Sequence, residues 1–363
     1  MKNTFGNNIS VTLFGESHGK GIGAVIDGLP GGIRVDEDFI RHQLSLRRPA
    51  GKISTPRQEK DEFIIYSGVF EGCTTGAPIC IVIPNNDTNS KDYSDNRAKA
   101  RPSHADFTAF IKYNGFEDYR GGGHFSGRIT AALVAAAAIL ISALKQKGIL
   151  IGTHIKKLTE VFDSEFYDYR SEIEAINKKT FALIDDSKRE EIEENILKAR
   201  RMGDSVGGIL ETAVVGLPVG IGEPWFDSLE GVLSHAVFSV PAVKGIEFGA
   251  GFSFADMKGS EANDGFYMSG DEVKTKTNNN GGINGGISNG MPIVFKTVIK
   301  PTPTISIEQQ TVDFIKKEDT VIASRGRHDP CIVHRARVVL DSVVAFALCD
   351  MLSQKYGTDW LAK

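Results

Sequence analysis

Residues 119–144 read YRGGGHFSGRITAALVAAAAILISAL, a turn with three consecutive glycines that leads directly into a long apolar segment. Because glycine has no Cβ, a ligand can come close to the backbone N–H groups of such a turn. A helix beginning just after it would add its own free N–H groups and its positive dipole end. Arg120 and Arg128 bracket the glycines with guanidinium groups suited to phosphate or carboxylate. The stretch indicates an anion or cofactor cradle, although a plain tight turn fits the glycines equally well.

The glycine pattern is not that of the two common nucleotide-binding loops. A Walker loop would need Gly-Lys-Ser or Gly-Lys-Thr after the glycines, and this chain has His124-Phe125-Ser126 there. The dinucleotide fingerprint needs spaced glycines after a strand and an acidic residue about 20 positions later. We therefore expect the turn to serve another class of anionic ligand.

The composition is typical of a soluble globular protein. The chain has 363 residues, of which 41% are hydrophobic, and its net charge is −4, with 42 basic and 46 acidic side chains. This balance excludes a generally basic nucleic-acid binder. The apolar segment 129–144 is short and weakly hydrophobic for a membrane span, so we expect a buried core helix and no membrane association. The four cysteines lack Cys-x-x-Cys spacing and no apolar leader begins the chain, which indicates a reduced, cytoplasmic protein.

Alternating and apolar runs predict an α+β fold. Strands are expected at 9–14, 22–26, 63–70, 79–83, 210–215, 243–248 and 292–299. Helices are expected at 36–46 with Asp36 as the cap, at 106–114, from the glycine turn to Lys147, and at 335–356, where the helix should be amphipathic. The charged run 185–201 is typical of a solvated helix face. Strands, then helices, then strands again favour α+β layers over repeated βαβ units.

Residues 277–290 read TNNNGGINGGISNG and admit two interpretations. Their composition is typical of a flexible linker, which is the interpretation that we favour. Alternatively, the paired glycines would let a second backbone loop lie against a flat ligand.

Three histidines lie in short segments that are rich in small or charged residues. His18 lies in GESHG, His104 in RPSHAD and His328 in RGRHDPC. Imidazole is the side chain best suited to move protons near neutral pH. A zinc site would need His-x-x-x-His or nearby cysteines, and a serine-hydrolase elbow would need Gly-x-Ser-x-Gly, which the chain misses by one residue. Acid–base chemistry is the functional interpretation that remains for these histidines. The simpler alternative is that they lie on the surface or cap helices.

A series of such segments, in order along the chain, resembles the chorismate synthase family. The segments are GESHG, RRP, SGVFEG, RPSHAD, DYRGGG, GEPWFD, AVKGIEFG, GGISNG, KPTPTI and GRHDPC. They extend from about residue 6 to residue 350, and only 151–201 lacks a recognisable landmark. The resemblance implies a single domain over 1–363, a large β-α-β sandwich with helices between antiparallel sheets and a variable helical, charged segment at about 151–201. It also implies a homotetramer.

The chemistry that the resemblance implies is that of a carbon–oxygen lyase of the shikimate pathway, which serves aromatic amino-acid biosynthesis. Members of the family eliminate phosphate and a ring hydrogen from 5-enolpyruvylshikimate 3-phosphate to give chorismate. They require reduced FMN, although the reaction has no net redox change. By the same resemblance, His18 would protonate the leaving phosphate, with Ser17 beside it as a hydrogen-bonding partner. His104 would stabilise the reduced flavin, and Asp329 would assist proton removal.

The resemblance further implies which residues bind substrate and cofactor. Substrate and FMN together bring two phosphates and two carboxylates, and a chain with a net charge of −4 must gather cations around them. The substrate anions would be bound by Arg47, Arg48, Lys52, Arg128 and Arg335. FMN would be bound by His124, Phe125, Ser126, Pro241, Ala242, Gly285, Lys300, Pro301, Thr302, Pro303, Thr304 and Arg327. Arg57 and Arg337 are further candidates, for which a surface role is equally compatible.

The chain departs from the family pattern within these sets. Many relatives have Arg-Ser-Ser where this chain has His124-Phe125-Ser126, and Asn-Ala where it has Pro241-Ala242. Lys52 replaces an arginine, which exchanges a bidentate fork for a point charge. Two other functions stay open from the sequence, an FMN oxidoreductase that uses NADPH and a non-catalytic protein that binds phosphate ligands.

Overall fold

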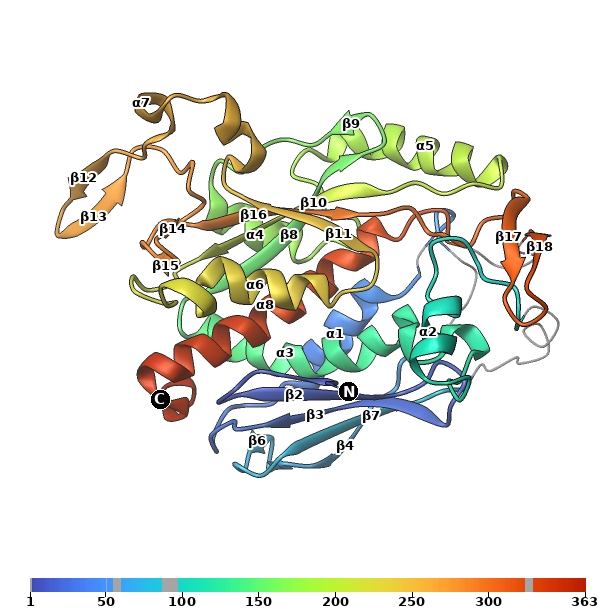
Figure 1. Ribbon diagram of the computed structural model, residues 1–363. Coiled ribbons are helices and arrows are strands. Elements are labelled where there is room, and N and C mark those ends of the chain that lie inside the picture. Colours follow the sequence, from blue (N-terminus) through green and yellow to red (C-terminus); the bar gives the residue numbers. More distant parts are fainter. Residues whose placement is uncertain (1, 50, 55–59, 87–96, 324–328) are drawn as a thin grey trace.

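Two five-stranded antiparallel sheets enclose a layer of helices in the computed structural model, which describes residues 2–49, 51–54, 60–86, 97–323 and 329–363 (Figure 1). The first sheet has the order β1 (Thr4–Phe5), β2 (Ser10–Gly15), β3 (Gly21–Asp27), β7 (Ile79–Pro84) and β4 (Ile64–Ser67). The second has the order β11 (Val243–Phe248), β16 (Ile293–Ile299), β10 (Gly208–Val215), β8 (Leu150–Leu158) and β9 (Val161–Phe162). The expected β-α-β sandwich is confirmed.

The middle layer consists of α1 (Glu37–Arg47), α3 (Thr130–Gln146), α6 (Leu229–Phe238) and α8 (Val333–Tyr356). Helix α3 packs on the first sheet at β3 and β7, and α8 packs on the second at β8 and β10, while α3 and α8 contact each other. Asp36 caps α1 as expected, its side chain accepting the Phe39 N–H at 3.0 Å. Gly127–Gln146 is long and apolar enough to cross a membrane, which corrects the expectation about its length, but 78% of its most apolar 18-residue window is buried inside the fold, as in a core helix.

Helix α8 is buried on all sides, so the expectation of an amphipathic closing helix is wrong. Every described side chain from Ala336 to Ser353 is buried, because both sheets, α3 and α6 surround the helix. Some of its buried polar residues serve the fold. Asp350 accepts the N–H groups of Asn7, Asn8 and Ile9 at 2.7–3.0 Å and so ties the start of the chain to the helix. Arg337 has no exposed surface, which excludes the surface role considered for it.

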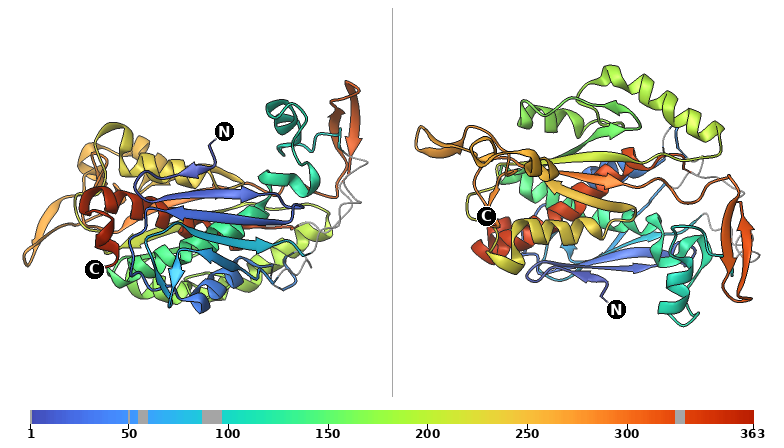
Figure 2. Two further views of the ribbon diagram at one scale, coloured as in Figure 1. Left: turned by 90° about the horizontal axis from the view of Figure 1, so that it is seen from below. Right: turned by 45° about the horizontal axis from the view of Figure 1, so that its top comes forward.

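Shorter elements complete the fold at its edges. They are β5 (Val69–Phe70), β6 (Cys73–Thr74), α2 (Asp106–Lys112), α4 (Tyr169–Ile176), α5 (Arg189–Arg201), α7 (Gly259–Ala262), β12 (Phe266–Ser269), β13 (Glu272–Thr275), β14 (Ile283–Asn284), β15 (Ile287–Ser288), β17 (Gln309–Asp313) and β18 (Glu318–Ile322). Figure 2 shows α2 and the β17–β18 hairpin at one end of the sandwich and the β12–β13 hairpin at the other. The strand expected at 63–70 is divided into β4 and β5 at Gly68, whose φ is +82°.

The linker interpretation of 277–290 is wrong, because these residues pack into the fold and include the β14–β15 hairpin. Ile283 is buried in the main core. A Cβ on Gly281 would lie 2.6 Å from the backbone nitrogen of Gly249, and one on Gly282 would lie 2.5 Å from the carbonyl oxygen of Pro292. The glycines therefore serve close backbone packing.

The segment at about 151–201 supplies β8 and β9 to the second sheet and the outer helices α4 and α5. Helix α4 packs on β8 and β10 over a small second core that includes Ile173, Ile176 and Phe166. Helix α5 buries only Ile192, Ile196 and Ala199 and is otherwise solvated, as the charge pattern predicted.

A buried histidine joins this segment to the second sheet. The His154 ring lies 2.7 Å from Asp163 through Nδ1 and 3.0 Å from Glu211 through Nε2, and its side chain has no exposed surface. Burial disfavours the imidazolium, but the hydrogen bonds to Asp163 and Glu211 outweigh this and raise the pKa of His154 above its ordinary value of 6.5. Asp163 also accepts the N–H groups of Ile184 and Asp185 at 2.7 and 2.9 Å. A charged His154 therefore holds the chain after β9 to the sheet.

Replacing His154 with glutamine is expected to lower the free energy of unfolding by ~3–5 kcal/mol, because two buried carboxylates lose a cationic partner. A raised folded-state pKa means that the stabilisation is complete below the ordinary value of 6.5 and is lost as the pH rises through the folded-state pKa. Urea unfolding of both proteins at about pH 6 and about pH 9 should give a smaller difference at the higher pH. His42→Gln, at an exposed histidine on α1, serves as the control. A difference that grows with pH would contradict the charged state.

Candidate active site

The glycine turn, Arg120–Phe125, is kinked at its three glycines, which are not helical and all have positive φ. The φ values are +58° at Gly121, +84° at Gly122 and +54° at Gly123, a region that strains residues with a side chain. A Cβ on Gly121 would lie 2.2 Å from two atoms of the His18 ring, and one on Gly122 would lie 3.5 Å from Cε1 of His104. Two histidine segments that are far apart in sequence therefore meet at neighbouring glycines of one turn.

Polar contacts hold this turn in place. The Ser17 N–H donates to the carbonyl oxygen of Gly123 at 3.1 Å, and Nδ1 of His124 lies 2.8 Å from the carbonyl oxygen of Gly15. Arg120 donates through Nε and Nη2 to Asp118, each at 2.8 Å, and these hydrogen bonds hold the pKa of Asp118 below its ordinary value. Arg120 is thus engaged within the turn, whereas the sequence suggested that it faces an anionic ligand.

His104 is held by the loop that precedes α2. Its Nδ1 lies 2.8 Å from Asp106, which also accepts three hydrogen bonds from Arg101, at its backbone nitrogen, Nε and Nη2 (3.0, 2.8 and 2.7 Å). Burial disfavours the Asp106 carboxylate, but the hydrogen bonds from Arg101 and His104 dominate and hold its pKa well below the ordinary value. Ser103 has a φ of +58°, and its carbonyl oxygen accepts a hydrogen bond from Nζ of Lys300 at 2.6 Å.

An arginine cluster surrounds the buried carboxylate of Asp61. Arg47, at the end of α1, and Arg48, its C-cap, each lie 3.6 Å from Oδ2 of Asp61. Arg128, in the 3₁₀ segment Gly127–Ile129 before α3, donates to Oδ1 of Asp61 and to the side chain of Asn85 at 3.1 Å. Sequence reasoning missed Asp61, since an isolated acid before a strand carries no motif.

A second ion pair links α8 to the end of α1. Arg335, in the first turn of α8, pairs with Asp329 and donates through Nε to the carbonyl oxygen of Arg47 at 2.8 Å. Two segments that lie near opposite ends of the chain thereby place cationic groups on one side of the site.

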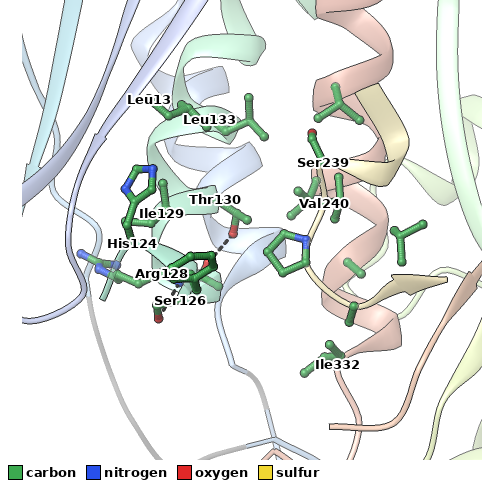
Figure 3. Close-up of a pocket in the computed structure, with 18 of the residues that line it drawn as sticks. Leu13, His124, Ser126, Arg128, Ile129, Thr130, Leu133, Ser239, Val240 and Ile332 are labelled. Carbon is green, nitrogen blue, oxygen red and sulfur yellow. Dashed lines mark hydrogen bonds between the residues drawn. The ribbon is translucent and has the colours of Figure 1, made fainter. Parts of the chain in front are cut away.

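A cavity of about 950 Å³ lies beside these groups, among the N-terminal end of α3, the C-terminal end of α6 and α8. Figure 3 places His124, Ser126, Arg128 and Thr130 on one wall, with Ser239 and Val240 facing them. Leu13 and Leu133 continue the wall into an apolar region. This volume is at the upper end of the roughly 300–1,000 Å³ usual for small-molecule sites, and the mixture of apolar surface with a few convergent polar groups is typical of them.

Most of the residues expected from sequence line this cavity. They are His104, Asp329, His124, Phe125, Ser126, Pro241, Ala242, Lys300, Thr302, Pro303, Thr304, Arg47, Arg128 and Arg335. Ser17 and His18 contact Gly121, which does line it, and Arg48 reaches Asp61, which lines it as well. The N–H of Lys300 donates to the carbonyl oxygen of Ala242 at 2.9 Å, so the segments 241–242 and 300–304 are adjacent.

The remaining expected residues lie elsewhere. Gly285 is in the β14–β15 hairpin and Pro301 is exposed, and neither lines the cavity. The carbonyl oxygen of Lys52 accepts a hydrogen bond from Nη1 of Arg200 at 2.6 Å. The side chain of Lys52 is exposed and lies outside the cavity wall. Arg57 and Arg327 lie outside the described residues.

The arrangement suits proton transfer on an anionic ligand. Two imidazoles border one turn, arginines converge beside them, and an apolar wall lowers the local dielectric constant, which strengthens each charged contact. Asp106 was treated in the sequence only as the start of a helix, although the pattern Arg-x-x-His-x-Asp could have indicated its contact with His104. Within the part of the chain that the structure describes, no group of three or more histidine, cysteine or acidic side chains could hold a metal ion.

Comparison with known proteins of similar sequence and structure shows the family of this chain. The sequence profile described as chorismate synthase matches residues 9–353. A chorismate synthase from Dehalococcoides mccartyi is 44% identical over 352 residues, covering 97% of this chain and 96% of its own. One from Pyrococcus abyssi is 45% identical over 347 residues, covering 96% of each chain. A crystal structure of chorismate synthase matches with a TM-score of 0.76 and 30% identity, covering 97% of this chain and 94% of that chain.

Proposed function

The chain belongs to the chorismate synthase family, and from this premise we propose that its cavity holds 5-enolpyruvylshikimate 3-phosphate beside reduced FMN. The activity of the family is a carbon–oxygen lyase reaction, the 1,4-elimination of phosphate from this substrate to give chorismate. The observation that carries the proposal is the meeting of His18 and His104 at neighbouring glycines of one turn, with the arginine cluster on the same cavity.

The substrate anions are assigned to the arginine cluster. Arg47 and Arg128 reach the cavity from different elements, and Arg335 reaches it from α8. Guanidinium groups bind phosphate and carboxylate through paired N–H donors, and a partly buried setting makes such bonds stronger than in water. Arg48 supports this group through Asp61. Lys52, exposed and outside the wall, is assigned no direct contact.

FMN is assigned to the wall formed by 124–126, 241–242 and 300–304. This wall fits FMN because it carries a buried polar group without a hydrogen-bond partner in the part of the chain that the structure describes, as well as because the cavity is large enough. Thr302 lines the cavity, and its buried Oγ1 has no hydrogen-bond partner among the described residues, although buried hydroxyls are normally paired. Desolvation and the nearby Lys244 lower the pKa of Lys300, an arrangement that an anionic ligand would offset. Reduced FMN held by these residues would supply electron density to the substrate ring.

The residues of the chain then supply acid–base and positioning functions. His18, buried against Gly121 with Ser17 beside it, is assigned to protonate the leaving phosphate. His104 is assigned to the cofactor side, where its Nε2 faces Gly122. Asp329, paired with Arg335, is assigned to proton removal. Each proton transfer of this kind typically contributes ~10²–10⁴ in rate.

A homotetramer in the cytoplasm that acts in aromatic amino-acid biosynthesis completes the proposal. Large exposed apolar side chains support assembly, among them Trp225 and Phe226 before α6 and Phe252 in the segment Gly251–Asp256, each at least 84% exposed. Large apolar side chains of this kind would be covered by a second copy of the chain in an assembly.

Phosphate release tests the proposed function directly. The purified protein is mixed anaerobically with 5-enolpyruvylshikimate 3-phosphate, with and without chemically reduced FMN, and inorganic phosphate and chorismate are measured. We expect equal amounts of both products, and only when reduced FMN is present. Phosphate release of the same rate without flavin, or none with it, would contradict the proposal.

The alternative of an NADPH-dependent FMN oxidoreductase finds no support among the relatives, which are chorismate synthases. It predicts that FMN loses its visible absorbance when the protein and NADPH are added without oxygen or substrate. We expect no bleaching under these conditions. Bleaching together with chorismate formation would mean that the chain reduces its own cofactor.

A further inference from the structure

The orientation of His104 is set by the carboxylate two residues later in the chain. Nδ1 of the ring lies 2.8 Å from Oδ1 of Asp106, on the side away from the glycine turn. A Cβ on Gly122 would lie 3.6 Å from Nε2, so this nitrogen is the one that faces the turn, and His104 itself lines the cavity. The two nitrogens therefore have separate environments, one within the loop and one at the site.

The proton on Nδ1 follows from the contacts of Asp106. Asp106 is ionised at neutral pH, since Arg101 donates to it from three nitrogens, and an ionised carboxylate can only accept. Nη2 of Arg101 also lies 3.1 Å from Nδ1 and could in principle donate to it. That arrangement would leave an unprotonated Nδ1 facing a carboxylate oxygen at 2.8 Å, where their lone pairs repel. The shorter, charge-assisted bond from Nδ1–H to Asp106 is the stronger of the two.

The surrounding loop leaves the ring little freedom. The His104 N–H donates to the carbonyl oxygen of Arg101 at 3.1 Å, and Lys300 holds the carbonyl oxygen of Ser103. Only about a fifth of the side-chain surface of His104 or of Asp106 is exposed, 19% and 18%. Asp106 in turn is held by Arg101 through a bidentate contact, so the acceptor is fixed before any ligand binds.

We propose that Asp106 is a positioning residue that fixes the proton of His104 on Nδ1 and so makes Nε2 the atom that exchanges a proton with the bound ligand. The assignment of a proton transfer to His104 rests on the proposed function, whereas the tautomer does not. In the transfer, Nε2 gains or releases one proton while the Nδ1–H bond to Asp106 stays intact. The arrangement corresponds to the aspartate of a catalytic triad, which orients a histidine without itself becoming protonated.

Asp106→Asn should reverse the tautomer. The amide oxygen would keep the backbone N–H and Nε of Arg101, which both bond Oδ2 of Asp106. The amide NH₂ would then stand at the position of Oδ1, toward His104, and Nδ1 would have to accept its hydrogen bond. The test uses the full-length protein without ligand, with ¹⁵N-labelled histidine, and reads the protonation of both ring nitrogens by two-bond proton–nitrogen NMR correlations at about pH 8. We expect His104 of the wild type to carry its proton on Nδ1 and His104 of the variant to carry it on Nε2. Asp106→Glu, which keeps a carboxylate, should retain the wild-type tautomer.

Asp313→Asn is the matched control. Asp313 is a buried carboxylate of β17 that accepts the N–H groups of Ile315 and Lys316, and the adjacent Phe314 packs on Phe107 and Phe110 of α2. This variant disturbs the same region without touching His104 and should leave the tautomer unchanged. Near-UV circular dichroism reports whether each variant is folded.

Two results would overturn the inference. One is a wild-type His104 with its proton on Nε2, and the other is an Asp106→Asn variant whose tautomer is reversed but whose turnover is unchanged. We expect roughly a tenfold or larger loss of kcat with little change of KM, and partial recovery in Asp106→Glu. An error in the proposed function would instead appear as wild-type protein that forms no chorismate although its His104 has the expected tautomer.

Discussion

Replacing His18 with alanine is expected to lower the turnover number by ~10²–10⁴ while the protein stays folded, because the leaving phosphate loses its proton donor. His18 is 8% exposed, lies against Gly121, and contributes electrostatically to the environment of Asp118. Its burial against the turn, out of bulk water, is suited to a proton transfer that solvent cannot replace. Chorismate formation with saturating reduced FMN measures the loss.

Two comparisons make this result specific. His42→Ala removes an exposed histidine from α1, outside the cavity wall, and should leave turnover unchanged. Substrate affinity of His18→Ala should change far less than turnover, since the arginine cluster remains. A folded His18→Ala protein that turns over at the wild-type rate would remove His18 from the mechanism.

Gly121→Ala is expected to reduce turnover nearly as much as the loss of His18 itself. The added methyl group would lie 2.2 Å from Cε1 and Nδ1 of His18 and 3.0 Å from Oγ of Ser17, so the imidazole must move away from the turn. The φ of +58° adds backbone strain of ~1–2 kcal/mol for any residue with a Cβ. Turnover and thermal unfolding, measured on the same preparation, separate the displaced ring from general destabilisation.

The control for this variant is Gly265→Ala. Gly265 lies between α7 and β12, and a Cβ there would meet nothing within 4 Å, so we expect wild-type turnover. The double variant Gly121→Ala/His18→Ala should be no slower than His18→Ala alone, because both changes remove the same interaction. Losses that multiply would mean that Gly121 acts on the reaction by another route.

Much of the local structure was predictable from the sequence. The capping aspartate of α1, the strands β2, β3, β7, β10, β11 and β16, and the long helix after the glycine turn all lie close to their expected bounds. These features depend on neighbours a few residues apart, such as a cap and its N–H partner or side chains that alternate across a strand. The glycine turn itself was evident from its composition.

The composition of the site was only partly predictable. The contact between Arg128 and Asp61 joins residues 67 positions apart, and the contact between Arg335 and Arg47 joins residues 288 apart. Neither leaves a periodic signal in the chain. Gly285, which matched the family pattern, lies in a hairpin outside the cavity wall, so a matching motif did not ensure a place at the site.

Helix α8 and the glycine turn show which features of the protein the local sequence determines and which only the tertiary structure decides. By itself the sequence determined that a helix occupies the end of the chain and that the backbone after Arg120 forms an open turn, because the first follows from local propensity and the second from three residues without a Cβ. Only the tertiary structure decided that both sheets bury this helix on every side and that the turn receives His18 and His104 at adjacent residues. The physical reason is that sheet pairing and burial join segments that are distant in the sequence. Close packing and charge select which segments meet, and no local sequence pattern does so.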